Sequence, residues 1–180
     1  ERHHRLVMDF LFDEVLAHQS RPVLEFLLKT AVLERLCDSL CAAVVGQQPA
    51  GKRPLLNDLT RTGLFLVSLD EEGIWYRYHP LFRELLLRRL AQEWGPAEIA
   101  ALHGRAGAWL AAQGFTEAAL RHLLTAGDVA TAVTLIEEQR HEMLNQGEMH
   151  RLNRWLGLLP EDVVARRPAL LQLKAWMLRW

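Results

Sequence analysis

The chain has 180 residues, of which 50% are hydrophobic and 24% are charged; this composition excludes a disordered tail and allows a sizeable buried core. The formal net charge is −1, and acidic and basic residues are balanced in both halves, so the basic excess typical of nucleic-acid-binding domains is missing. We therefore expect a soluble globular protein of one domain or two small ones, without direct nucleic-acid contact.

Helices are predicted through the first third of the chain. Apolar residues at helical spacing indicate the first, Pro22 suits the first turn of the second, and Asp38 is predicted to cap the third, which Gly46 ends. A fourth short helix follows a polar loop rich in Gly and Pro. The predicted helices are Leu6–His18, Val23–Ala31, Ser39–Val45 and Pro54–Thr62.

The loop Gly46–Arg53 also satisfies most of a phosphate-loop pattern. Arg53, however, stands where that pattern needs a Ser or Thr to hold magnesium, no strand precedes the loop, and Pro54 follows closely. We interpret the match as coincidental, and we find no nucleotide-hydrolysing motif in the sequence.

The pattern then changes to that of strands. Leu64–Leu69 and Ile74–Tyr78 are short β-prone runs, and Asp70–Gly73 between them has the composition of a turn, so the three segments predict a β-hairpin. Pro80 begins a long helix that runs to about Trp94. Helices packed before a hairpin predict a winged-helix arrangement. DNA reading by Pro54–Thr62 is disfavoured, because Arg61 is its only basic residue and Asp58 opposes phosphate.

The second half is predicted to be helical throughout. Gly95-Pro96 breaks the preceding helix and is a candidate hinge. Breaks at Gly114, Gly127 and Gly147 follow at short intervals, which predict helical hairpins. The packing pattern around Trp109 echoes tetratricopeptide (TPR) repeats.

Prolines restart the last two helices, at Pro160 and Pro168. The predicted fold class is therefore mainly α, with a helical winged-helix domain containing one β-hairpin at 1–94 and the start of a domain of TPR-like helical hairpin repeats at 95–180. Such repeats leave a concave surface for a partner.

No catalytic or metal-binding constellation is visible in the sequence. The histidines are scattered without zinc spacing, and no serine lies in a nucleophile motif. Cys37 and Cys41 lie four positions apart, and we interpret them as small buried hydrophobes, which suits a reducing compartment. No apolar run reaches the roughly 20 residues that span a bilayer. We predict a cytoplasmic protein that is not an enzyme, holds no metal and makes no membrane contact.

His79 lies where the hairpin ends and the long helix begins. An imidazole at this position can reach past the hairpin toward a bound anion and gain charge near phosphate. The alternative is local: His79 is the N-cap of the helix, with Pro80 in the first turn. The residues alone leave both interpretations open.

Four segments resemble the MalT-like, LuxR-family ATP-dependent transcriptional regulators of the STAND class. The hairpin run Leu64–Leu69 and the segment Trp75–Leu86, which includes His79 and Pro80, resemble the winged-helix region of that family. Phe26–Cys37 resembles the helix that leads into it, and Leu102–Leu110 resembles the start of the TPR-like sensor arm.

The resemblance implies a regulatory role. Such proteins carry an upstream nucleotide-binding module, and in related ATPases a histidine that opens the winged-domain helix contacts the β-phosphate of ADP. The matching residue here is His79, although Pro80 replaces the usual acidic residue after it. The resemblance implies ADP or ATP in the full-length protein, no cofactor in this chain, and a small-molecule inducer or regulatory protein at the helical arm.

We expect the chain to be an excised piece of such a regulator. It would relay effector binding and nucleotide state to oligomerisation and transcription control. The alternative is a TPR-like protein-interaction scaffold with no nucleotide sensing.

Overall fold

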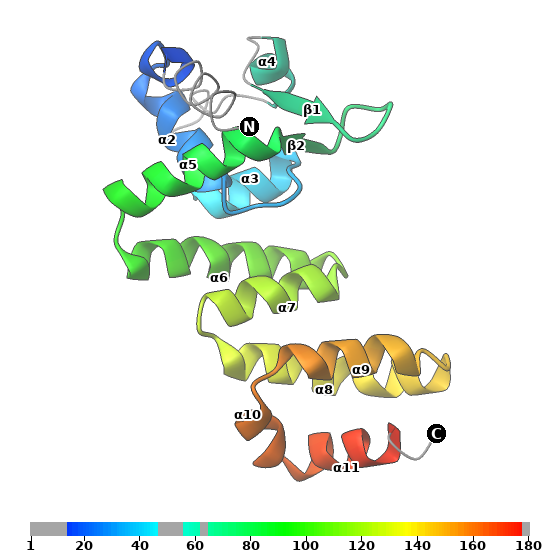
Figure 1. The fold of residues 1–180 in the computed structure, drawn as a ribbon. Coiled ribbons are helices and arrows are strands. Elements are labelled where there is room, and N and C mark those ends of the chain that lie inside the picture. Colours follow the sequence, from blue (N-terminus) through cyan, green and yellow to red (C-terminus); the bar gives the residue numbers. More distant parts are fainter. Residues whose placement is uncertain (1–13, 47–55, 62–64, 178–180) are drawn as a thin grey trace, which may run out of the picture. The chain divides into compact units, whose positions relative to one another are not determined.

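The computed structural model describes residues 14–46, 56–61 and 65–177 and divides into two compact units (Figure 1). We call Glu1–Arg105 the wing unit and Ala106–Trp180 the repeat unit. Helix α6 (Pro96–Ala112) begins in the wing unit and ends in the repeat unit. The predicted division between residues 94 and 95 stays a prediction.

The wing unit is built mainly from helices. α2 (Arg21–Thr30) packs against α3 (Asp38–Val45) and α5 (Pro80–Glu93), and a short α4 (Leu56–Arg61) precedes the hairpin. These spans confirm the predicted helices at Val23–Ala31 and Ser39–Val45, and they confirm the helix predicted at Pro54–Thr62 over its described residues 56–61. The core is filled by large apolar side chains that include Phe26, Leu27, Leu40, Phe82 and Leu86.

Two predictions near the N-terminus lie mostly outside the described residues. The helix predicted at Leu6–His18 is described only from residue 14, and residues 14–17 are helical. Of the phosphate-loop-like segment Gly46–Arg53, only Gly46 is described, and it ends α3 with a φ of 82° as predicted.

The start of α3 corrects one prediction. Cys37, not Asp38, is the N-cap, and Asp38 is the first helical residue. The carboxylate of Asp38 instead accepts a hydrogen bond from the backbone N–H of Leu56, at 3.2 Å, where α4 begins. Asp38 therefore caps the beginning of a different helix. Cys37 and Cys41 are both buried, as predicted.

The predicted hairpin is confirmed. β1 (Leu66–Ser68) and β2 (Tyr76–Tyr78) pair antiparallel, with Leu66 opposite Tyr78. The carboxylate of Asp70 fixes the turn by accepting hydrogen bonds from the N–H groups of Ile74 (2.8 Å) and Trp75 (2.9 Å). Figure 1 shows the turn extending beyond the helices of the wing unit as its wing.

The repeat unit contains the end of α6 and further helices. They are α7 (Thr116–Thr125), α8 (Val129–Asn145), α9 (Met149–Leu158), α10 (Glu161–Ala165) and α11 (Pro168–Met177). α8 packs against α7 and α9, and α11 packs against α9 and α10. Pro160 is the N-cap of α10, and Pro168 is the first residue of α11, so both prolines start helices as predicted.

The three predicted glycine breaks share one geometry. Gly114, Gly127 and Gly147 have φ values of 79°, 79° and 72°, which a glycine adopts without steric cost. Each donates to the carbonyl three positions earlier, and the next residue donates to the carbonyl five positions earlier, as Phe115 does to Leu110 at 2.9 Å. This pair of bonds is the Schellman motif, which ends a helix and turns the chain.

The helices of the array repeat in pairs, a long helix followed by a short one. The long helices α6 and α8 have 17 residues each, and the short helices α7 and α9 have 10 residues each. The step from Pro96 to Val129, where the long helices begin, equals the step from Thr116 to Met149, where the short ones begin. This common step is about 33 residues, close to the roughly 34 residues of a TPR repeat. The spacing of Gly114, Gly127 and Gly147 does not show this period, because long and short helices alternate between the glycines.

The described structure therefore has the predicted fold class: mainly helical, with a two-stranded wing followed by helical hairpins. Among the helices that the structure describes, none combines the length and apolar character that a membrane crossing requires.

Candidate functional site

The junction between β2 and α5 holds His79 by its backbone. His79 is the N-cap of α5, and Pro80 occupies the first turn. The His79 N–H donates to the carbonyl of Phe65 at 2.7 Å, and its own carbonyl accepts from the N–H of Arg83 at 2.9 Å. The predicted N-cap position is thus confirmed. The imidazole is not used to cap the helix, and the residue is half-buried.

Buried aromatic residues anchor both sides of this junction. The Tyr78 hydroxyl lies 2.7 Å from the hydroxyl of Thr30, which also donates to the carbonyl of Phe26. The ring of Phe82 contacts Tyr78 edge-on at 5.9 Å and Phe65 at 5.3 Å between centroids. Burial raises the pKa of Tyr78, and the nearby Cys41 raises it further, so the hydroxyl keeps its proton. The backbone on both sides of His79 is therefore held by buried side chains.

Arg83 fixes α5 to residues 31–33, the segment that follows α2. Its Nε donates to the carbonyls of Ala31 (2.9 Å) and Leu33 (3.0 Å), and a terminal nitrogen donates to Val32 at 3.2 Å. Ala31 is the C-cap of α2, and Val32 and Leu33 follow it outside the helix. The guanidinium therefore supplies donors to backbone carbonyls that no regular element of the described structure pairs. Burial lowers the pKa of Arg83, an effect opposed by Glu34, but an arginine stays charged.

Sequence reasoning missed this contact. The acceptors are backbone carbonyls in a distant part of the chain, and no side-chain pattern marks them.

The first part of α6 is held on the wing unit in a similar way. Arg105 donates from Nε to the carbonyl of Val44 at 2.7 Å, in the last turn of α3. Burial lowers the pKa of His103, and the positive charge of Arg83 lowers it further. Since Gly95-Pro96 precedes both residues, movement about this candidate hinge would require the Arg105–Val44 hydrogen bond to break.

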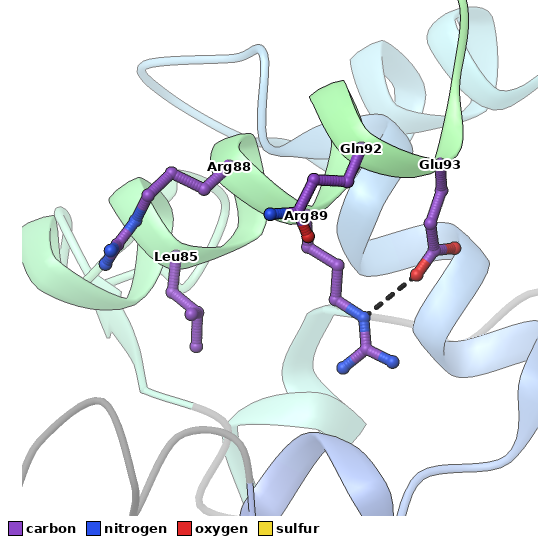
Figure 2. Close-up of a pocket in the computed structure, with 5 residues that line it drawn as sticks. All are labelled: Leu85, Arg88, Arg89, Gln92 and Glu93. Atoms are coloured by element: carbon purple, nitrogen blue, oxygen red, sulfur yellow. Dashed lines mark hydrogen bonds and ion pairs between the residues drawn. The ribbon is translucent and has the colours of Figure 1, made fainter.

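A pocket of about 430 Å³ opens beside α5 (Figure 2). Its described lining is Leu85, Arg88, Arg89, Gln92 and Glu93. Figure 2 shows Arg88 and Arg89 pointing in different directions, and Arg89 Nε bonds Glu93 at 2.9 Å. The cationic character of the pocket is thus partly neutralised by its own glutamate, and His79 is not among the lining residues.

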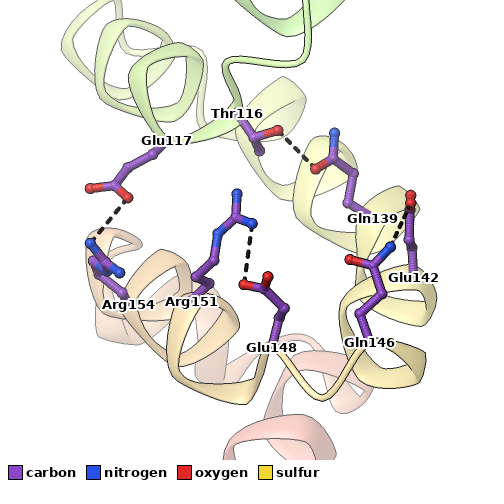
Figure 3. Close-up of polar contacts among 8 residues, drawn as sticks. All are labelled: Thr116, Glu117, Gln139, Glu142, Gln146, Glu148, Arg151 and Arg154. Carbon is purple, nitrogen blue, oxygen red and sulfur yellow. Dashed lines mark hydrogen bonds and ion pairs between the residues drawn. The ribbon is translucent and has the colours of Figure 1, made fainter.

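Polar side chains connect the helices of the repeat unit (Figure 3). Thr116 Oγ1 donates to Gln139 Oε1 at 2.8 Å, joining α7 to α8. Arg154 lies 3.5 Å from Glu117, joining α9 to α7. These contacts cross from one helical hairpin to the next, so the hairpins form one packed array.

The described residues hold no group of three or more His, Cys, Asp or Glu placed to bind a metal ion.

Helices that support a two-stranded wing, followed by helical hairpins, define a winged-helix protein with a helical extension. Residues 12–98 match the family described as the MalT winged helix domain. This match covers the hairpin, His79 and α5, so the chain contains a MalT-like winged-helix domain.

Proposed function

We propose that this chain is the non-catalytic relay of a signal-responsive, ATP-dependent transcriptional regulator of the LuxR family and STAND class. It couples effector binding at the repeat unit and the nucleotide state of an upstream module to oligomerisation and transcription. The observation that carries the proposal is His79: a half-buried imidazole on a fixed backbone, at the exit of a MalT-like wing.

In this proposal, His79 contacts the β-phosphate of ADP bound by the upstream nucleotide-binding module. An imidazole donates a hydrogen bond to phosphate and gains positive charge beside it. The hydrogen bonds of Tyr78 and Arg83 connect the backbone around His79 to the helical core. A displacement of His79 would therefore also move α2 and α5. Full release of the wing from ADP corresponds to the open, ATP-bound state.

The switch requires only modest energy. A ligand shifts a two-state equilibrium by its difference in affinity for the two states, and a complete reversal takes about 5.5 kcal/mol. One charge-assisted contact contributes about 1.5–3 kcal/mol, so His79 would supply part of the closed state's stability rather than all of it.

The test is His79→Ala in the protein that includes the nucleotide-binding module. The ADP that co-purifies is quantified, and basal transcription is measured without inducer. We expect less retained ADP and higher basal transcription, because the closed state loses its phosphate contact. His141→Ala, an exposed position on α8, is the matched control. Unchanged ADP retention and unchanged basal activity in His79→Ala would remove the proposal.

The regular pairing of long and short helices in the repeat unit favours a second candidate, a scaffold that binds a regulatory protein without sensing nucleotide. Under this alternative, partner binding is the same with ADP, ATP or neither. A nucleotide-dependent change in partner affinity that His79→Ala abolishes would favour the relay.

A further inference from the structure

A groove of about 330 Å³ lies between α8 and α11 in the repeat unit. Its apolar walls come from Leu144, Ala169 and Leu173, and its polar groups are Arg140 and Gln172. The described lining thus includes one cation and no carboxylate. This volume is at the lower end of the range for small-molecule sites.

Among the described residues, none neutralises the charge of Arg140. Some other arginines of the chain pair with a glutamate one helical turn away, as Arg121 does with Glu117 at 2.9 Å. The residues four positions before and after Arg140 are Ile136 and Leu144, which cannot pair with it. Within the described part of the chain, its guanidinium has no hydrogen bond or ion pair, although the residue is half-buried.

Two carboxylates of α8, within three positions of Arg140, are already engaged. Glu137, about one turn before Arg140, lies 3.6 Å from Arg167, which precedes α11. Glu142 accepts a hydrogen bond from Gln146 at 3.0 Å on another part of α8 (Figure 3). Because Glu137 pairs with Arg167, Arg140 remains available to a ligand.

The helical repeat places Gly107 of α6 at the position equivalent to Arg140 of α8. A Cβ added at Gly107 would lie 2.8 Å from Leu123 Cγ, so this position is closely packed in the first helical pair. In the second pair the same position carries a long cation that lines a groove. Arg140 is therefore not a requirement of the repeat's packing.

We propose that the groove between α8 and α11 binds a small amphipathic monoanion, such as a carboxylate on an apolar body. The guanidinium of Arg140 binds the carboxylate through paired N–H donors, the Gln172 amide adds a hydrogen bond, and Leu144 and Leu173 cover the apolar body. The proposal rests on the proposed function only in taking the repeat unit as the part that receives the effector.

The test uses the 180-residue chain and the fluorescent probe 1-anilinonaphthalene-8-sulfonate, which is itself an amphipathic monoanion. We expect saturable fluorescence enhancement that octanoate displaces and the uncharged octanamide does not. Arg140→Gln should weaken probe binding roughly tenfold or more, because a charge-assisted pair is lost. Arg166→Gln is the matched control, since Arg166 is exposed and does not line the groove. Equal affinities in the two variants would overturn the proposal.

A second variant keeps the test valid if Arg140→Gln does not fold, which circular dichroism would show. Ala169→Phe fills the groove without changing its charge, and it should also abolish probe binding. Unchanged binding by folded Ala169→Phe, or equal displacement by octanoate and octanamide, would overturn the proposal. The assay involves neither nucleotide nor transcription, so its failure is distinguishable from failure of the His79 test.

Discussion

The hydroxyl of Tyr78, at the end of the wing, lies 2.7 Å from the hydroxyl of Thr30 in the last turn of α2. Both residues are buried, and they are 48 positions apart in the chain. This contact, together with the hydrogen bonds of Arg83, attaches the strand that leads into His79 to the helical core. The wing is therefore held at its base while its turn remains exposed.

Tyr78→Phe should destabilise the wing unit by about 1 kcal/mol, because a buried hydrogen bond is lost while Thr30 keeps its bond to Phe26. Urea unfolding measures the change. Tyr76→Phe is the control on the same strand, since no side-chain hydrogen bond involves its hydroxyl in the described structure. A Tyr78→Phe midpoint equal to that of Tyr76→Phe would count against this anchoring role.

Arg83→Met should destabilise the chain by about 2 kcal/mol, since three backbone carbonyls in the segment that follows α2 lose their donor. Arg83→Lys should fall between wild type and Arg83→Met, because an ammonium keeps the charge but not the forked geometry. The control is Arg77→Met on the exposed side of β2, expected within about 0.5 kcal/mol of wild type. Equal effects of the Arg83 and Arg77 substitutions would contradict this role of Arg83.

Alanine substitutions at two glycines of α6, Gly104 and Gly107, should change the stability of the chain in opposite directions. Gly107→Ala should destabilise by about 1–3 kcal/mol, because the new Cβ meets Leu123 at 2.8 Å. Gly104→Ala has no atom within 4 Å of its Cβ and should stabilise by about 0.5–1 kcal/mol, the usual gain of alanine over glycine in a helix. Thermal unfolding compares the two. A stabilising Gly107→Ala would show that α6 and α7 pack less closely than described.

The wing unit should lose stability as the pH falls below about 6.5, in part through His103. Burial and the charge of Arg83 lower the pKa of His103 in the folded chain, while the unfolded chain keeps the ordinary value of 6.5. Between these two pKa values the unfolded state binds the proton and the folded state does not, so acid favours unfolding. The stability gained on going from about pH 5.5 to about pH 7.5 should be smaller in His103→Gln than in wild type. His141→Gln, which removes an exposed histidine, should retain the wild-type slope.

Local signals predicted most of the fold. The Schellman turns depend on single glycines such as Gly114, and the helix starts depend on prolines such as Pro80, so these boundaries could be read directly. The repeat period was missed because long and short helices alternate, which hides a regular period within irregular glycine intervals. The N-cap of α3 was predicted one position too late, at Asp38 instead of Cys37. The carboxylate of Asp38 accepts a hydrogen bond from the Leu56 N–H and does not cap its own helix.

The candidate site was only partly predictable. His79 was identified as a candidate by its place between the hairpin and Pro80 and by the resemblance of this segment to the MalT-like family, and its role stays a prediction. Arg83 and Arg105 could not be found, because both bind backbone carbonyls that any sequence would supply. The sequence does not show that Arg140 lacks a carboxylate partner among the described residues, because Glu137 lies only three positions before it. The structure shows that Glu137 pairs instead with Arg167, in a different helical hairpin of the chain.

The most direct test of the relay is the His79 imidazole itself, observed by NMR in the protein that includes the nucleotide-binding module. On addition of ADP, the ring signals of His79 should shift, because the imidazole then donates a hydrogen bond to the phosphate. The signals of the exposed His141 should stay unchanged. Saturating ADP that leaves the His79 ring signals unmoved would contradict the account.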